Sequence, residues 1–73
     1  MNKTDPERDR ANGVRLRILR GDKTQAAAAA DVGITTMALS LYELGKRRPC
    51  DEIKIRLARY YGSTVHDIFF ADE

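Results

Sequence analysis

Between Thr24 and Gly45 the chain carries two short apolar segments separated by a glycine, and this stretch limits the possible fold more than any other. It reads TQAAAAADVGITTMALSLYELG. The five alanines at 26–30 have the highest helix propensity of any residue, and Thr24 before them is a good N-cap. Gly33 supplies the left-handed residue that ends a helix, and Thr35 offers the next N-cap two residues later. The stretch therefore predicts two helices joined by a turn of only a few residues.

The second of these helices, expected over about residues 36–44, has a buried and an outward face. Leu39 and Tyr42 lie three residues apart and are expected to be buried, because such residues share one side of a helix. Gly45 ends the helix. The positions that point outward are Thr36, Met37, Ser40 and Leu41, and the cations that follow the glycine are Lys46, Arg47 and Arg48. Two short helices of this kind, with cations directly after the second, are typical of a helix-turn-helix.

The charges of the chain are unevenly distributed. The 73 residues have a net charge of only +2, but residues 14–48 hold seven cations against three anions, a net charge of +4. Residues 51–73 hold three cations against five anions, a net charge of −2. This asymmetry predicts one surface for an anionic partner and a second surface of different character.

Composition excludes several classes of protein. Hydrophobic residues make up 42% and charged residues 33%, which favours a folded domain over disorder. The chain has neither the roughly 20-residue apolar run of a membrane span nor an apolar signal segment, so we expect one cytoplasmic domain over residues 1–73 without a membrane partner. One cysteine, Cys50, and one histidine, His66, are too few for a disulfide, a zinc site or a nucleophile with its base. We therefore expect no enzyme, metal, cofactor or small-molecule ligand.

A further helix is expected before the central pair. Asp5, Pro6 and Glu7 form a typical helix start after a frayed tail in the first four or five residues, and the helix would end near Arg20. We expect this helix to place Leu16 and Leu19 in the core, with Val14 and Ile18 as a second apolar pair.

Two more helices are expected after the central pair. Asp51 is a candidate N-cap for a helix over about residues 52–61, and Thr64 for a last helix over about residues 65–70. The expected core-facing residues are Ile53, Leu57, Ala58 and Tyr61 in the first of these, and Val65, Ile68 and Phe69 in the second. With no strand pattern in the sequence, the predicted fold class is all-α with five helices.

A set of residues at fixed spacing from residue 16 to residue 69 carries a resemblance to a known family. The set is Leu16, Leu19, Arg20, Thr24, Gln25, Ala29, Gly33, Thr35, Leu39, Tyr42, Glu43, Gly45, Lys46, Pro49 and residues 62–69. On these residues the chain resembles the Cro/Xre phage-repressor helix-turn-helix family, and within it the short-loop subgroup of bacterial and mobile-element regulators. The phrases LRGDKTQ, YELG and DEIK are those of this subgroup. The resemblance implies a five-helix lambda-repressor-like DNA-binding domain with its helix-turn-helix over residues 24–45.

The resemblance also implies a function and its residues. Residues 36–44 would be the recognition helix of a sequence-specific transcriptional regulator, a repressor, which enters the major groove of double-stranded DNA as a homodimer on paired half-sites. The base-reading residues would be Thr36, Met37, Ser40 and Leu41, and the phosphate-binding residues Thr24, Gln25, Thr35, Lys46, Arg47 and Arg48. Arg20 and Glu43 resemble a structural ion pair of the family. Ile68, Phe69 and Phe70 are the candidate dimer interface, with completion of the monomer core as the alternative.

Two departures from the family pattern leave alternatives open. Ala28 stands where the family has a large aliphatic residue, so Tyr42 or Tyr61 must fill that volume or leave a cavity. The outward positions of the second helix, usually polar in the family, here form an apolar stripe of Met37, Leu41 and Leu44. Such a stripe would also suit a module that binds a protein partner, like an antitoxin or anti-repressor.

Overall fold

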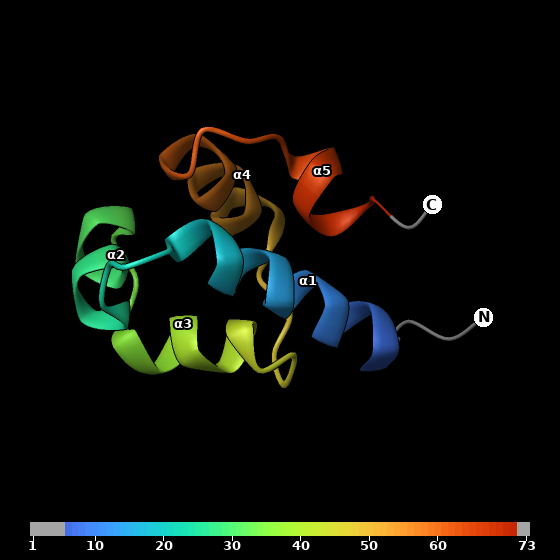
Figure 1. The fold of residues 1–73 in the computed structure, drawn as a ribbon, viewed down its shortest axis with the longest axis horizontal. Coiled ribbons are helices and arrows are strands. Elements are labelled where there is room, and N and C mark those ends of the chain that lie inside the picture. The colour runs from blue at the N-terminus through green and yellow to red at the C-terminus, as the bar shows by residue number, and fades with distance from the viewer. Residues whose placement is uncertain (1–5, 72–73) are drawn as a thin grey trace.

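The computed structural model describes residues 6–71, and within this range it contains five helices and no strand. The helices are α1 (Pro6–Arg20), α2 (Gln25–Val32), α3 (Thr36–Glu43), α4 (Asp51–Tyr60) and α5 (Val65–Phe69). Figure 1 shows α3 below α1, α4 and α5 above α1, and α2 at one end of the molecule. The fold class is therefore the five-helix, all-α architecture that the sequence predicts. The expected tail and the Asp5 cap lie outside the described residues.

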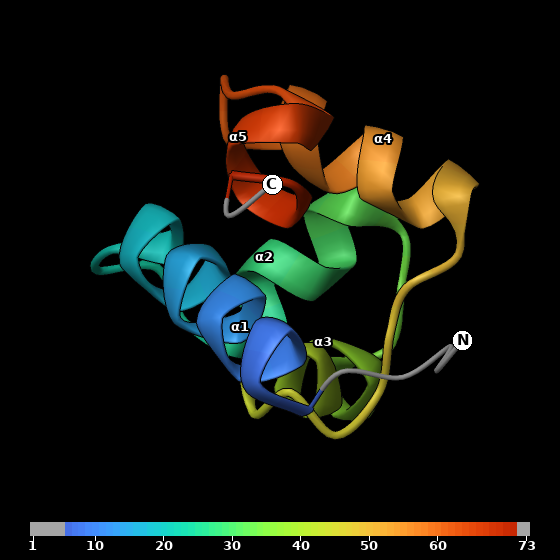
Figure 2. The same cartoon turned by 90° about the vertical axis from the view of Figure 1, so that its right-hand side faces the viewer.

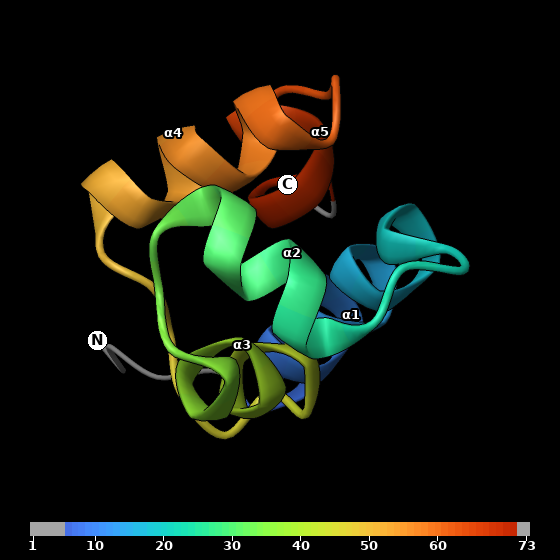
Figure 3. The same ribbon diagram turned by 90° about the vertical axis from the view of Figure 1, so that its left-hand side faces the viewer.

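The helices form two sides of the molecule. In the views of Figures 2 and 3, α4 and α5 lie on one side and α3 on the other, with α2 between them. Within residues 6–71, no helix has the length and apolar character that crossing a membrane requires. In these views α3 therefore lies on the side of the molecule opposite α4 and α5.

Three threonines begin three of the helices. The side-chain oxygens of Thr24, Thr35 and Thr64 each accept a hydrogen bond of 3.0 Å from the backbone N–H three residues on. Each bond satisfies one of the N–H groups that the first turn of a helix leaves without an internal partner. These three predicted caps are confirmed. Gly33 ends α2 with a φ of 88°, as predicted from the sequence.

The predicted cap of α4 is wrong by one residue. Cys50 is the N-cap and makes no side-chain cap hydrogen bond, while Asp51 is the first residue inside the helix. There its carboxylate lies 3.9 Å from the Lys54 ammonium and beside the positive end of the helix. Asp51 therefore acts through charge rather than through a cap.

One apolar core joins all five helices. Leu39 and Tyr42 of α3 are buried in it, as predicted. Its members are Leu16, Ala28, Ala29, Val32, Leu39, Tyr42, Leu57, Ala58, Ile68 and Phe69. Ala28 is fully buried. Of the two aromatic residues expected to fill the volume beside it, Tyr42 belongs to the core and Tyr61 packs against the core.

The predicted core face of α1 is partly wrong. Leu16 is buried, but Leu19, Val14 and Ile18 are 38%, 54% and 71% exposed. The buried positions are instead Asn12 and Gly13, because α1 turns its smallest residue toward the end of α3. A Cβ at Gly13 would lie 2.2 Å from the carbonyl oxygen of Glu43. Close approach of two backbones thus decides which face of α1 is buried.

A second glycine completes this crossing. Gly45 follows α3 with a φ of 72°, and a Cβ there would lie 2.7 Å from the Cα of Arg10 in α1. Glycine at 45 is therefore required both by its left-handed backbone and by the space that α1 leaves.

The candidate dimer interface needs correction. Ile68 and Phe69 are only 1% and 2% exposed, since α5 turns both side chains into the core of the same chain. They complete the monomer core and offer no surface to a second copy. Phe70 is half-buried, and the Lys54 ammonium lies 5.0 Å from the centre of its ring.

Candidate nucleic-acid interface

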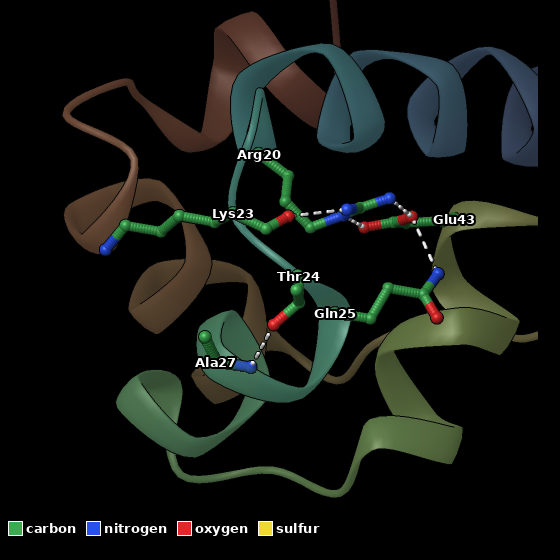
Figure 4. A network of polar contacts seen from close by, with 6 residues as sticks. All are labelled: Arg20, Lys23, Thr24, Gln25, Ala27 and Glu43. Carbon is green, nitrogen blue, oxygen red and sulfur yellow. Dashed lines mark hydrogen bonds and ion pairs between the residues drawn. The ribbon is translucent and has the colours of Figure 1, made fainter.

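A charged network joins α1, α2 and α3 at one point. Arg20 at the end of α1 donates from Nε and Nη2 to the two carboxylate oxygens of Glu43, at 2.7 and 3.0 Å. Gln25, the first residue of α2, donates from Nε2 to the same carboxylate at 3.0 Å. Figure 4 shows Glu43 between these two donors, with the Lys23 ammonium directed away from them. Because Glu43 ends α3, the network sets the position of α3 relative to α1 and α2.

Burial makes this network strong. The Glu43 side chain is 4% exposed and the Arg20 side chain 16%. The hydrogen bond with Glu43 raises the pKa of the Arg20 guanidinium above its usual value, against the opposing effect of desolvation. Arg20 also donates from Nη1 to the Lys23 carbonyl at 2.7 Å, which holds the loop between α1 and α2.

At the N-terminus of α2, Thr24 caps the helix and the side-chain amide of Gln25 already makes a hydrogen bond. The Thr24 hydroxyl accepts from the Ala27 N–H, so its own hydrogen remains free to donate outward. Gln25 is half-buried and donates from Nε2 to Glu43, a contact across 18 residues of sequence. The backbone N–H groups of this first turn carry the positive end of the helix dipole, which attracts phosphate.

The predicted outward face of α3 is exposed in its first turn and partly covered one turn later. Thr36 and Met37 in its first turn are exposed, while Ser40 and Leu41 one turn later are half-buried. Thr35 caps the helix by accepting from the Ala38 N–H at 3.0 Å.

The three cations after α3 differ in their surroundings. Lys46 and Arg47 are exposed and have no ion-pair partner among residues 6–71. Arg48 is engaged with Asp9 of α1, with 3.3 Å between its guanidinium and the carboxylate. Lys46 and Arg47 are therefore the free positive charges at this end of α3.

Sequence reasoning missed two residues near this surface. One is Asp9, which neutralises Arg48 from a position 39 residues away. The other is Arg17, which is exposed and lines a hollow of about 180 Å³ with Arg20, Gln25, Ser40, Glu43 and Leu44. The four-residue spacing from Gly13 could have indicated Arg17, since both then share the side of α1 that faces α3.

A second polar cluster lies away from this surface. Lys23 donates to the Tyr60 hydroxyl, which donates to Asp31, each at 2.7 Å, and this exposed cluster ties α2 to α4. The hydrogen bonds with Tyr60 raise the pKa of Lys23 and lower the pKa of Asp31. Cys50 and His66 are both exposed. Among the described residues there is no group of three His, Cys, Asp or Glu that could hold a metal ion.

The two capped helices around a short glycine turn, with α3 exposed along one side, define a helix-turn-helix domain. A family model for helix-turn-helix proteins matches residues 14–68. The chain therefore belongs to this family, in the Cro/Xre type that the sequence resembles.

A solved structure agrees with this assignment. The chain is similar to the crystal structure of the clp gene regulator ClgR from C. glutamicum, with a TM-score of 0.78 and 25% sequence identity. The similarity covers 94% of this chain and 91% of that chain. A comparison with curated protein sequences gave no significant match. The family and the structural neighbour together support a DNA-binding regulator.

Proposed function

We propose that this protein is a transcriptional repressor that binds specific sites in double-stranded DNA with α3 in the major groove. The observation that carries the proposal is that two exposed cations, Lys46 and Arg47, directly follow an exposed helix capped by Thr35 and have no ion-pair partner among residues 6–71. Occupying a DNA site is enough to block other proteins from it, so repression needs no further surface. Such a regulator acts where the genome is, which for a bacterial or phage-type protein is the cytoplasm.

The base contacts come from α3. In a docked helix-turn-helix, the N-terminal part of the second helix reaches the base edges, which here means Thr36 and Met37, followed by Ser40 and Leu41. The hydroxyls of Thr36 and Ser40 suit several base edges, so each of these contacts discriminates only modestly.

The phosphate contacts come from both ends of the motif. Thr24 and Gln25 present the N-terminus of α2, and Thr35 that of α3. Lys46 and Arg47 supply full positive charges, with a smaller contribution from Arg48 because Asp9 already neutralises it. These contacts hold the protein on the duplex without reading sequence.

We further propose that two copies bind paired half-sites. One domain of this size makes few phosphate contacts, so a single copy binds weakly, and a two-fold pair doubles the contacts. Because Ile68 and Phe69 are buried in the monomer core, the contact between the two copies must use other residues. Sedimentation of the protein with a duplex that carries one or two half-sites measures this stoichiometry, and one copy per two-half-site duplex contradicts the pair.

The test of DNA binding is an NMR titration of the labelled protein with a mixed-sequence duplex at low salt. Non-specific binding already reports the electrostatic surface, so the operator need not be known. We expect amide shifts at Thr24–Ala26, Thr35–Leu41 and Lys46–Arg48 that fade as salt rises. Unchanged amides in these three segments would refute the proposal.

Matched variants sharpen the test. Lys46→Ala and Arg47→Ala should each lower the slope of log K against log salt by about 1. Arg59→Ala removes the same charge from an exposed position of α4, on the side of the molecule opposite α3, and should leave the slope unchanged. Equal losses in all three variants would mean that the net charge acts rather than this surface.

A further inference from the structure

The outward face of α3 has no side chain that pairs with a base edge through two hydrogen bonds. Guanine is usually read by Arg or Lys, adenine by Asn or Gln, and cytosine by Asp or Glu. None of these residue types occurs at outward positions 36, 37, 40 or 41. The large exposed side chains of this face are Met37 and Leu44, which are 69% and 55% exposed. The large exposed side chains of this face are therefore apolar, and its polar side chains, Thr36 and Ser40, are small.

Met37 is the apolar residue best placed to meet a base. It is the second residue of α3, and the N-terminal residues of a recognition helix reach the base edges. Leu44 directly follows the C-terminus of α3 and lines the hollow beside Arg17 and Gln25. Leu44 thus lies near the residues that we assign to the phosphates, away from the N-terminal end of α3.

An apolar side chain in the major groove has only one kind of apolar partner there. Placed against O6 and N7 of guanine, or against N6 and N7 of adenine, a methionine displaces water and returns no hydrogen bond, which costs free energy. The C5 methyl of thymine is the apolar group that the major-groove edges offer.

We propose that Met37 is a specificity-determining residue that contacts a thymine methyl group, so that each half-site contains thymine at the position Met37 faces. This inference rests on the proposed DNA-binding function and names the base that the function requires. Thr36 and Ser40 tolerate more than one base beside it, because their hydroxyls both donate and accept.

The first experiment separates the methyl group from the rest of the base. Binding sites are selected from a pool of duplexes with a randomised centre, and each selected thymine is then replaced singly by deoxyuridine, which lacks only the methyl. We expect one thymine per half-site whose replacement weakens wild-type binding about four-fold, the value for burial of one methyl-sized group. Met37→Ala should bind the thymine duplex more weakly and show no further loss with deoxyuridine.

Leu44→Ala is the matched control. It truncates a comparably exposed apolar residue at the other end of α3, so it should keep the full four-fold dependence on the methyl. Because Met37 is exposed, its variants should fold, and unchanged thermal melting checks this. Equal methyl dependence in the wild type and in Met37→Ala overturns the proposal.

A change of specificity gives an independent test. Glutamine at position 37 can pair with N6 and N7 of adenine, so Met37→Gln should select adenine where the wild type selects thymine. If it selects the same half-site as the wild type, Met37 does not read a base. In that case the proposed DNA-binding function still holds if Lys46→Ala lowers the salt dependence of binding as expected. If neither the wild type nor any variant binds DNA, both the proposed function and the role of Met37 are wrong.

Discussion

Arg20 and Glu43 form a bidentate ion pair in which one oxygen of the carboxylate also accepts from Gln25. The pair spans 23 residues of sequence and links the end of α1 to the end of α3. Since Gln25 begins α2, one carboxylate holds the ends of three helices together. The position of α3 relative to α1 and α2 therefore depends on a single buried carboxylate.

Removing the Glu43 carboxylate should unfold much of the domain. Glu43→Ala leaves the Arg20 guanidinium buried without its counter-charge, which we expect to cost about 3 to 5 kcal/mol of unfolding free energy. Glu43→Gln keeps the shape and some of the hydrogen bonds, so its loss should be smaller. Denaturant unfolding of the two variants measures both values. A loss below about 0.5 kcal/mol for Glu43→Ala, the range of surface substitutions, contradicts the structural role of the pair.

Gly13→Ala should destabilise the protein although alanine is the better helix former. In an exposed helix this change stabilises by about 1 kcal/mol. Here the new methyl would lie 2.2 Å from the Glu43 carbonyl oxygen, so α1 and α3 must separate. We expect a loss of about 3 kcal/mol or more in thermal or denaturant unfolding.

Gly21→Ala is the control for Gly13→Ala. Gly21 has a φ of 59° but no atom within 4 Å of a new Cβ, so it isolates the cost of backbone strain, about 1 to 2 kcal/mol. If the two variants lose the same stability, the close approach of α1 to α3 carries no special cost.

The central helix pair could be predicted from the sequence because its determinants are local. Thr24 and Thr35 each cap a helix through a bond to a residue three positions away, and Gly33 takes a left-handed conformation within the same turn. These features depend only on neighbours in sequence. The burial of Leu39 and Tyr42 likewise follows from their spacing within one helix.

The register of α1 and the pairing of Arg48 could not be predicted in this way. Apolar residues occur on several sides of α1, and the buried side is chosen by the fit of Gly13 against Glu43, 30 positions later in the chain. The sequence assigns Arg48 to the phosphates together with Lys46 and Arg47 and gives no sign of Asp9, which contacts Arg48 from α1. Both outcomes depend on how segments distant in sequence approach one another.

Tyr61→Phe should maintain or increase stability. The Tyr61 hydroxyl is buried and has no hydrogen-bond partner in the described part of the chain, so the hydroxyl costs desolvation free energy without return. Its removal should raise the unfolding free energy by about 1 kcal/mol. Tyr60→Phe is the matched control: it removes a hydroxyl that bonds both Lys23 and Asp31, and stability should fall. A clear loss of stability in Tyr61→Phe would show that its hydroxyl has a favourable contact.

Tyr61 also predicts a loss of stability in alkaline solution. Burial, and then the nearby charge of Glu43, raise the pKa of Tyr61 above its usual value of 10.0. The unfolded chain therefore loses this proton at lower pH than the folded chain, so stability falls as the pH rises above 10.0 and through the folded pKa. Lys23, whose pKa is also raised, acts in the same direction. Denaturant unfolding at pH values below and above this range measures the decrease in stability. The decrease should be smaller in Tyr61→Phe than in the wild type. An equal decrease would mean that other groups cause it.

Asp9→Asn should strengthen DNA binding. The Asp9 carboxylate lies 3.3 Å from the Arg48 guanidinium, which follows α3 on the side where we place the phosphates. Without that carboxylate the surface around Lys46, Arg47 and Arg48 is more positive by one charge, so affinity at low salt and its salt dependence should both rise. The Asp9 side chain is 14% exposed and the Arg48 side chain 41%, so thermal melting of Asp9→Asn is measured alongside binding to check that the fold is kept. Asp67→Asn removes the same charge from α5, on the side opposite α3, and should change neither quantity. If Asp67→Asn strengthens binding as much as Asp9→Asn, the gain reflects net charge alone, and Arg48 takes no specific part in holding the duplex.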